Sequence, residues 1–233
     1  MFSIHQPCYF PWLGLLHKIA KSDTLIVLDE VQLSDSAYQH RNQFLTMDGK
    51  VKYLTIPFIK HNYLALPFKE LKIANETWAG DHKNFLLSNY KKHPYFDQIY
   101  PQIESILTSR SPYLIDAVMD SMRTSISLFG LSTQIIMQSQ LNYDRSAKKG
   151  DLVIQLLKAS KVNEYLSGHG ALCYQDNAAF ESEGIVLNYT DFTHPAYPQK
   201  NSLEFISGLS CLDLLFNVGI EQGRSLLQRS NNQ

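Results

Sequence analysis

Hydrophobic residues in the first part of the chain follow three patterns in turn. Residues 1–5 (MFSIH) form a short apolar run that ends before Pro7, and we expect a strand there because proline cannot donate a ladder hydrogen bond. Apolar residues then recur at helical spacing over 12–20. The segment 24–31 (TLIVLDEV) opens with continuous apolar residues, which is typical of a strand buried on both faces. A strand, a helix and a buried strand predict a parallel unit.

The middle of the chain combines hairpin and helical patterns. Asp48-Gly49 is a strong hairpin turn signal, because apolar strand segments flank it on both sides. Residues 69–74 (KELKIA) predict a further short strand. Helical segments bounded by Pro, Ser or Gly follow at 78–96, 96–109 and 111–130. Ser111-Pro112 is expected to cap the last of these helices, with proline at its first position.

Strands and helices alternate again after residue 130. Strands are expected at 133–139, 163–168 and 185–192, and helices at 150–160, 174–184 and 210–228, the last one broken near Gly219. The whole pattern predicts an α/β fold with a doubly wound, mostly parallel, Rossmann-like sheet. We expect residues 1–233 to form a single domain, in which residues 38–130 insert a β-hairpin and a helical segment between the two halves.

Composition narrows the class of protein. The chain has 233 residues, of which 44% are apolar and 12% aromatic, enough for a substantial core. The net charge of −1 argues against a general electrostatic grip on nucleic acid, which needs a basic face. Cys8, Cys173 and Cys211 are widely separated, which suits a reducing compartment and neither a disulfide framework nor a zinc site. No targeting segment or membrane-spanning run is evident, so we expect a cytoplasmic protein without membrane insertion.

Polar and aromatic residues gather where predicted strands end. In an open α/β sheet, ligands bind beyond the carboxyl ends of the strands, near the point where strand order reverses. The candidate site residues are therefore those that follow each strand: His5, Gln6, Tyr9, Trp12, Asp29, Glu30, Gln32, Arg41, Asn42, Ser139, Asn142, Ser167, Gly168, His169, Gly170, His194 and Tyr197.

Two of these residues are candidates for catalysis. His5 can act as a general base or donate to a phosphate, because an unperturbed histidine has a pKa near 6.5. The alternative for His5 is a hydrogen-bonded structural histidine. Asp29 can bind a ribose hydroxyl, a metal or an amine, and its alternative is the cap of a helix or turn.

The other candidates suit binding. Two glycines in 167–170 (SGHG) let the backbone approach a ligand, and a following helix can direct N–H groups at an anion. A tight turn that needs glycine for positive φ remains the alternative. Arg41 and Asn42 can clamp a phosphate or carboxylate, or simply lie on the hairpin surface. Tyr9 and Trp12 can stack on a ring, or belong to the core.

Several site classes lack their signatures. Eight histidines show no metal-ligand spacing, so no metal site is expected. The chain has no GxSxG elbow, no P-loop and no GxGxxG after the first strand. Nucleotidylyl-transfer folds also place a histidine after the first strand, but their paired HxGH is missing here because the next histidine is His17. That likeness is an analogy of fold only.

Seven segments resemble a known family. They are IHQPCYFPWLGLLHKIAKSDTLIVLDEVQ, YQHRNQF, YLTIPF, KHPYF, EYLSGHGALCYQD, HPAYPQ and LSCLDLLFNVG, and they cover nearly the whole chain. The chain resembles the WbqC-like family of bacterial proteins, often encoded in gene clusters for O-antigen and other surface polysaccharides. Two departures are mild: residues 8–10 read Cys-Tyr-Phe where Asn-Tyr-Leu is more usual, and His17 replaces an aspartate, so His17 is not counted as a site.

The resemblance implies a role in amino-sugar decoration. We expect a transferase that attaches an aminoacyl group such as glycyl, or another acyl group, to an amino-sugar nucleotide in surface-polysaccharide (O-antigen, lipopolysaccharide) biosynthesis. The turn at 167–170 and Arg41 would hold the diphosphate, Tyr9 or Trp12 would stack, and His5 or Asp29 would deprotonate the amine.

Other functions stay open at this point. One alternative is an ATP-dependent adenylating or nucleotidyl-transfer enzyme, and another is a non-catalytic sugar-nucleotide-binding protein. The acyl donor is activated either by ATP with magnesium in this site or beforehand. A homodimer is compatible with the sequence, which does not fix the oligomeric state.

Overall fold

The computed structural model describes residues 1–34, 38–108, 110–171 and 175–229. Its centre is a parallel sheet of five strands in the order β5-β2-β1-β6-β7. The strands are β1 (Phe2–His5), β2 (Thr24–Val27), β5 (Gln134–Met137), β6 (Glu164–Ser167) and β7 (Val186–Tyr189). The chain adds β2 and β5 on one side of β1, then returns to add β6 and β7 on the other. Strand order therefore reverses between β1 and β6, and the predicted α/β, Rossmann-like class is confirmed.

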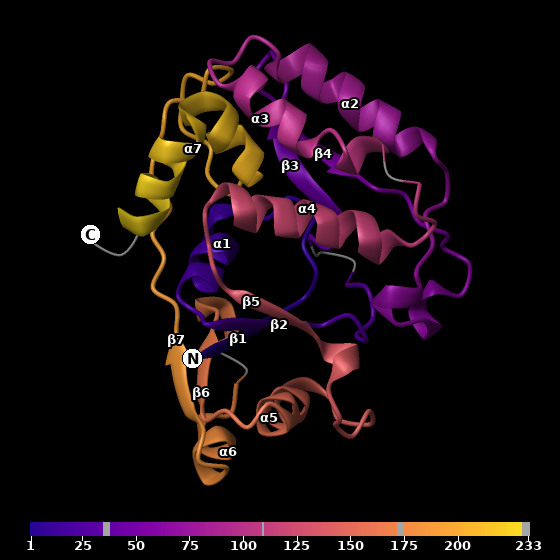
Figure 1. Cartoon of the computed structure of the whole chain (residues 1–233), viewed down its shortest axis with the longest axis vertical. Helices are drawn as coiled ribbons and strands as arrows, with labels where there is room; N and C mark the ends of the chain where they lie inside the picture. Colours follow the sequence, from indigo (N-terminus) through magenta and orange to yellow (C-terminus); the bar gives the residue numbers. More distant parts are fainter. Residues whose placement is uncertain (35–37, 109, 172–174, 230–233) are drawn as a thin grey trace.

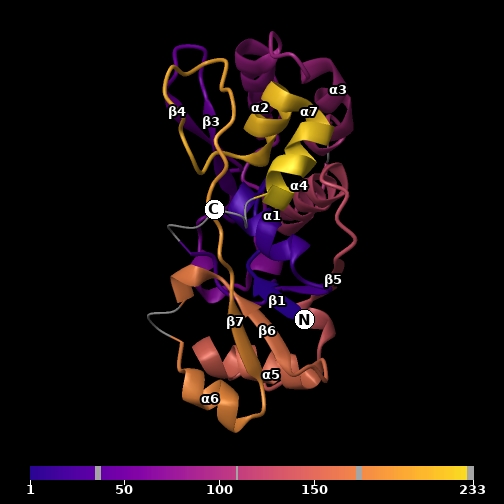
Figure 2. The same cartoon turned by 90° about the vertical axis from the view of Figure 1, so that its left-hand side faces the viewer.

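Both faces of the sheet are buried, as the continuous apolar strands predict. Successive side chains of a strand point to opposite faces. Thus Leu25 and Val27 pack in one apolar core and Ile26 in the other. Helix α1 (Leu13–Ala20) covers the first face, while α5 (Lys149–Ala159) and α6 (Asn177–Ser182) cover the second (Figures 1 and 2).

The segment between β2 and β5 holds the predicted hairpin and helices. The hairpin consists of β3 (Arg41–Leu45) and β4 (Val51–Thr55), and the helices are α2 (Thr77–Tyr90), α3 (Phe96–Ile103) and α4 (Leu114–Leu128). Helix α7 (Cys211–Arg229) joins this part of the molecule at the C-terminal end (Figure 1). The predicted break in α7 is confirmed at Gly219, whose φ is 80°. A side chain there would meet the ring of Tyr95 at 2.7 Å.

Two local predictions in the middle of the chain are wrong. Residues 69–74 are not a strand: Phe68–Glu70 is a 3-10 helix, and only isolated bridges follow it. The third inserted helix begins at Leu114, two residues beyond the start expected from Ser111-Pro112. One cause explains both errors, because the two segments bond to each other. The Ile73 amide donates to the Pro112 carbonyl at 2.8 Å and the Leu114 amide to the Leu71 carbonyl at 2.9 Å.

Two further observations concern the predictions from composition. Cys8 and Cys211 are free and buried, while Cys173 lies outside the described residues. None of the helices in the described ranges is long and apolar enough to cross a membrane.

Candidate functional site

The carboxyl ends of β1 and β6 border a crevice at the point where strand order reverses. It consists of two cavities of about 410 Å³ and about 790 Å³. Both are lined by His5, Lys18, Gly168 and Gly170. The smaller cavity opens on the α1 face of the sheet and the larger one on the α5 face. The structure therefore places the predicted His5 and the predicted glycine turn at one junction.

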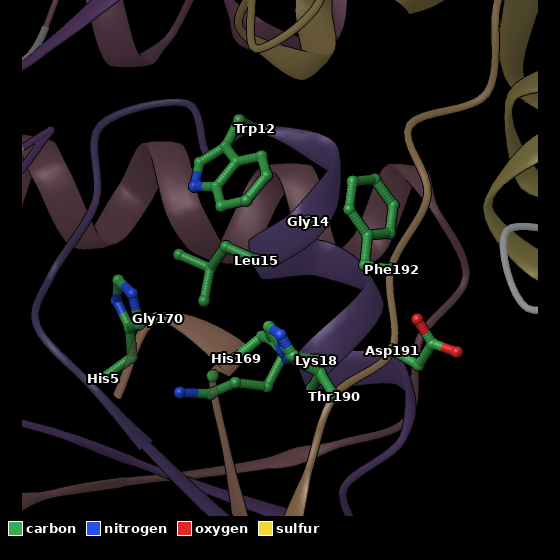
Figure 3. Close-up of a pocket in the computed structure, with 11 residues that line it drawn as sticks. His5, Trp12, Gly14, Leu15, Lys18, His169, Gly170, Thr190, Asp191 and Phe192 are labelled. Atoms are coloured by element: carbon green, nitrogen blue, oxygen red, sulfur yellow. The ribbon is translucent and has the colours of Figure 1, made fainter. Parts of the chain in front are cut away.

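The smaller cavity, which we call the aromatic chamber, is built around Trp12 and Phe192 (Figure 3). The centroids of the two rings are 5.8 Å apart, and the ring planes are nearly perpendicular. The remaining lining residues are His5, Gly14, Leu15, Lys18, Gly168, His169, Gly170, Thr190 and Asp191. A β-carbon on Gly14 would lie 2.1 Å from the Trp12 ring. Glycine at this position therefore lets the indole lie over the first turn of α1 and face the chamber.

The larger cavity, the wide chamber, has an apolar floor and several polar groups. Its lining comprises Ile4, His5, Gln6, Lys18, Leu28, Val31, Lys149, Gly150, Leu152, Val153, Tyr165, Ser167, Gly168, Gly170, Ala171 and Gln175. The predicted residues Gln6 and Ser167 thus belong to this chamber. An apolar wall with a few polar groups is typical of small-molecule sites.

The glycines in the turn after β6 leave space for a ligand beside the backbone, and the backbone conformation does not require them. Neither Gly168 nor Gly170 has a positive φ, and a β-carbon on either would meet none of the described residues within 4 Å. The alternative of a turn that requires positive φ is therefore wrong. The expected free helix N-terminus is also not found, because the Asp176 carboxylate caps α6 by accepting from the amides of Ala178 and Ala179. The turn therefore places backbone without side chains at Gly168 and Gly170 beside the junction.

His5 is neutral at physiological pH. Its ring Nδ1 lies 2.8 Å from the Gln6 carbonyl oxygen, which can only accept, so Nδ1–H donates and Nε2 keeps the lone pair. Burial, and then the positive charge of Lys18, lower the pKa of His5 to about 3. A neutral imidazole with a lone pair can accept a hydrogen bond from a substrate.

Lys18 is the residue that the sequence analysis missed. The residue is 5% exposed, and Nζ donates to the Ile4 carbonyl oxygen at 2.7 Å. Burial lowers the pKa of Lys18 to about 8. From the sequence alone, a lysine in this position is expected to be exposed to solvent. However, its spacing from Gly14 and Leu15 puts it on their face of the helix, and that signal could have found it.

Two predicted site residues, Asp29 and Ser139, are hydrogen-bonded to each other. The Asp29 carboxylate accepts from the Ser139 amide at 2.9 Å and from the Ser139 hydroxyl at 2.6 Å. Asp29 is 3% exposed. These bonds connect the ends of β2 and β5, next to the crevice but outside the lining of both chambers.

Three more predicted residues direct their polar atoms into the fold. The Asn42 amide donates to the carbonyls of Tyr9 at 3.0 Å and Phe10 at 2.7 Å, which fixes the loop after β1. The Tyr9 hydroxyl lies 3.0 Å from Nδ1 of His82. The Tyr197 hydroxyl donates to the buried Asp213 carboxylate at 2.9 Å. None of the three lines either chamber.

The remaining predicted residues lie outside the two chambers or at their edge. The Arg41 guanidinium lies over the Tyr53 ring, 4.7 Å from its centroid. Gln32 is exposed and donates to the Leu64 carbonyl. His169 is exposed at the rim of the aromatic chamber. Within the described ranges, no three His, Cys, Asp or Glu side chains are grouped as metal ligands.

Comparisons with known proteins place the chain among bacterial relatives. A sequence model described as the WbqC-like protein family matches residues 6–225. An uncharacterized protein of Mycobacterium tuberculosis (strain ATCC 25618 / H37Rv) is 27% identical over 222 residues, which cover 94% of each chain. No solved structure matches significantly.

Proposed function

Because the chain belongs to the WbqC-like protein family, we propose that it is a transferase that attaches an acyl group to the amine of an amino-sugar nucleotide. The acyl group is an aminoacyl group such as glycyl, or another small acyl group, and the product enters surface-polysaccharide synthesis. The observation that carries the proposal is the two-chambered crevice at the reversal point of a Rossmann-like sheet, with His5 at its junction.

A crevice of this shape suits a reaction of two substrates. Group transfer requires both reacting atoms to meet in one place, and holding them there lowers the entropic part of the barrier. The aromatic chamber and the wide chamber lead to the same junction from opposite faces of the sheet. The nucleotide enters from the aromatic side, where Trp12 can stack on a ring. The acyl donor enters from the wide side.

The chemistry at the junction is nucleophilic acyl transfer. The amine nitrogen forms a bond to the acyl carbonyl carbon, the bond from that carbon to the leaving group breaks, and the leaving group takes the electron pair. The nitrogen loses one proton, which passes to the departing leaving group. Neutral His5 accepts a hydrogen bond from the amine and holds it in line for attack, whereas an imidazolium would repel the ammonium form. Asp29 has no assigned step, since Ser139 engages both of its oxygens.

An adenylating reaction is a second candidate, and one observation favours it. Lys149, at the start of α5, lines the wide chamber with Lys18, so two cations can face a polyphosphate there. In that case ATP with magnesium activates the acyl group in the same site. A turnover assay distinguishes both enzymes from the third alternative, a non-catalytic sugar-nucleotide-binding protein.

A thermal-shift panel with the purified chain tests these functions. The ligands are ATP, acyl-CoA, glycine and UDP-, dTDP- and GDP-linked amino sugars. A ligand at about 100 times its Kd should stabilise the fold by about 2.7 kcal/mol, a shift of a few degrees. Stabilisation by one amino-sugar nucleotide, followed by N-acylated product in mass spectrometry, supports the transferase. Stabilisation by ATP alone favours adenylation.

His5→Ala separates catalysis from binding. The transferase account expects lost turnover with retained nucleotide binding. Binding without turnover in the wild type, with every donor tested, would point to the non-catalytic alternative.

A further inference from the structure

Lys18 is a buried cation without a carboxylate partner. Among the described residues, its ammonium group donates to a neutral carbonyl, that of Ile4, and takes part in no salt bridge. Buried charges in proteins are normally paired, because removing an ion from water is costly. An ammonium group also has three donors, so the Ile4 carbonyl leaves capacity for an acceptor that the described residues do not supply.

The acidic residues around the crevice are directed elsewhere. Asp29 bonds to Ser139, as described above. Glu30 pairs with Lys69 at 2.7 Å and with Arg145 at 3.2 Å. Asp191 lines the aromatic chamber but is exposed, and its carboxylate points away from Lys18 (Figure 3). Lys18 therefore keeps its positive charge unneutralised beside two cavities.

The position of Lys18 matches the middle of an elongated ligand. It lines both chambers, with Gly168 and Gly170 bordering the same two cavities. Since these glycines carry no β-carbon and have open space beside them, a bulky anion can approach the backbone closely. In a sugar nucleotide, the diphosphate is the group between the nucleoside and the sugar.

We propose that Lys18 binds the diphosphate of a sugar nucleotide at the junction, with the nucleoside in the aromatic chamber and the amino sugar at the inner end of the wide chamber. This inference rests on the proposed function. The sequence assigns the phosphate-binding cation to Arg41, but Arg41 lies on the hairpin over Tyr53 and lines neither chamber. The buried lysine takes that role.

Calorimetric titration of the full chain tests the assignment. The probes are inorganic diphosphate, UDP and uridine, and the variants are Lys18→Met and Lys21→Met. Met replaces the long side chain without its charge, and Lys21 is an exposed lysine at the end of the same helix, so it controls for net charge. We expect Lys18→Met to weaken UDP and diphosphate binding about 10- to 100-fold, uridine binding to stay the same, and Lys21→Met to bind like the wild type.

The outcomes separate this inference from the function it rests on. UDP binding that is equal in Lys18→Met and wild type overturns the inference and leaves the transferase standing. Diphosphate binding through Lys18, without binding of any amino-sugar nucleotide, supports the anion site and rejects the function. Wild-type protein that binds neither diphosphate nor UDP overturns the inference.

A measurement on the wild type covers the case in which Lys18→Met does not fold. Reductive methylation followed by peptide mass spectrometry reports the access of each lysine. Diphosphate should protect Lys18 and not Lys21. Equal labelling of Lys18 with and without saturating diphosphate overturns the inference.

Discussion

The ammonium nitrogen of Lys18 lies 2.7 Å from the carbonyl oxygen of Ile4. This contact joins α1 to the end of β1 and places a positive charge inside the protein, beside the neutral ring of His5. The two residues come from segments that flank a loop at residues 6–12 (QPCYFPW), which contains two prolines and three aromatic residues. That loop is unusual because it is packed inward: Tyr9 and Phe10 are fully buried, and Asn42 holds their carbonyls. Its tight packing leaves His5 and Trp12 facing the crevice.

Acid should destabilise the protein because several buried histidines must stay neutral. Burial lowers the pKa of His40, His82 and His93 to about 4. Between pH 6.5 and 4 the unfolded chain therefore binds more protons than the folded one, and stability falls as pH falls. Together with His5, whose pKa is lowered to about 3, these groups give a slope on the order of 5 kcal/mol per pH unit near pH 5. Urea unfolding at pH 7, 6 and 5 measures it.

A single histidine change isolates one of these groups. His82→Gln should reduce the slope by roughly the contribution of one proton, about 1.4 kcal/mol per pH unit. Identical slopes in the wild type and His82→Gln would be inconsistent with a neutral buried His82.

Gly14→Ala should displace Trp12 from the aromatic chamber. The new β-carbon would lie 2.1 Å from the indole, so the ring must move. We expect a change in tryptophan fluorescence and weaker binding of any ligand that stacks there. Gly80→Ala in α2 is the control, since its β-carbon meets none of the described residues within 4 Å, and the change should stabilise the helix by about 0.5–1 kcal/mol. Unchanged fluorescence in Gly14→Ala would show that Trp12 does not cover the helix.

Ser139→Ala and Asp29→Asn should affect stability more than catalysis. Each change removes or weakens a bond to a buried group, at a cost of about 1–3 kcal/mol in the free energy of unfolding. Turnover per folded molecule should stay near the wild-type value. Urea unfolding and an activity assay on the same samples separate the two effects. A large loss of turnover in a fully folded Asp29→Asn variant would instead indicate a catalytic role for Asp29.

Much of the fold could be predicted because its signals are local. The continuous apolar residues at 25–28, the Asp48-Gly49 turn and the glycine inside α7 each act on their own neighbours. The prediction at 69–74 failed because that segment bonds to 112–114, some forty residues away, and no local pattern encodes such pairing. Boundaries that depend on a distant partner need the structure.

The candidate site was predicted in part for a related reason. The sequence places polar residues at strand ends but does not say which way their side chains point. Asn42, Tyr9 and Asp29 lie near the predicted edge, yet they turn inward and stabilise the loops. Lys18 was missed because its charge suggested solvent, although helical spacing put it on the face with Gly14 and Leu15. Whether a polar side chain faces solvent, the core or the crevice depends on its burial, and burial depends on the whole fold.

The most direct test of the crevice as the ligand site is a crystal structure of the wild-type chain with a UDP-linked amino sugar. The account predicts a diphosphate oxygen within hydrogen-bonding distance of Lys18 Nζ, the base beside Trp12 and Phe192, and the amino sugar next to His5. A nucleotide ordered elsewhere, for example in the cavity of about 530 Å³ beside Trp78 and Arg110, with both chambers empty, would contradict it.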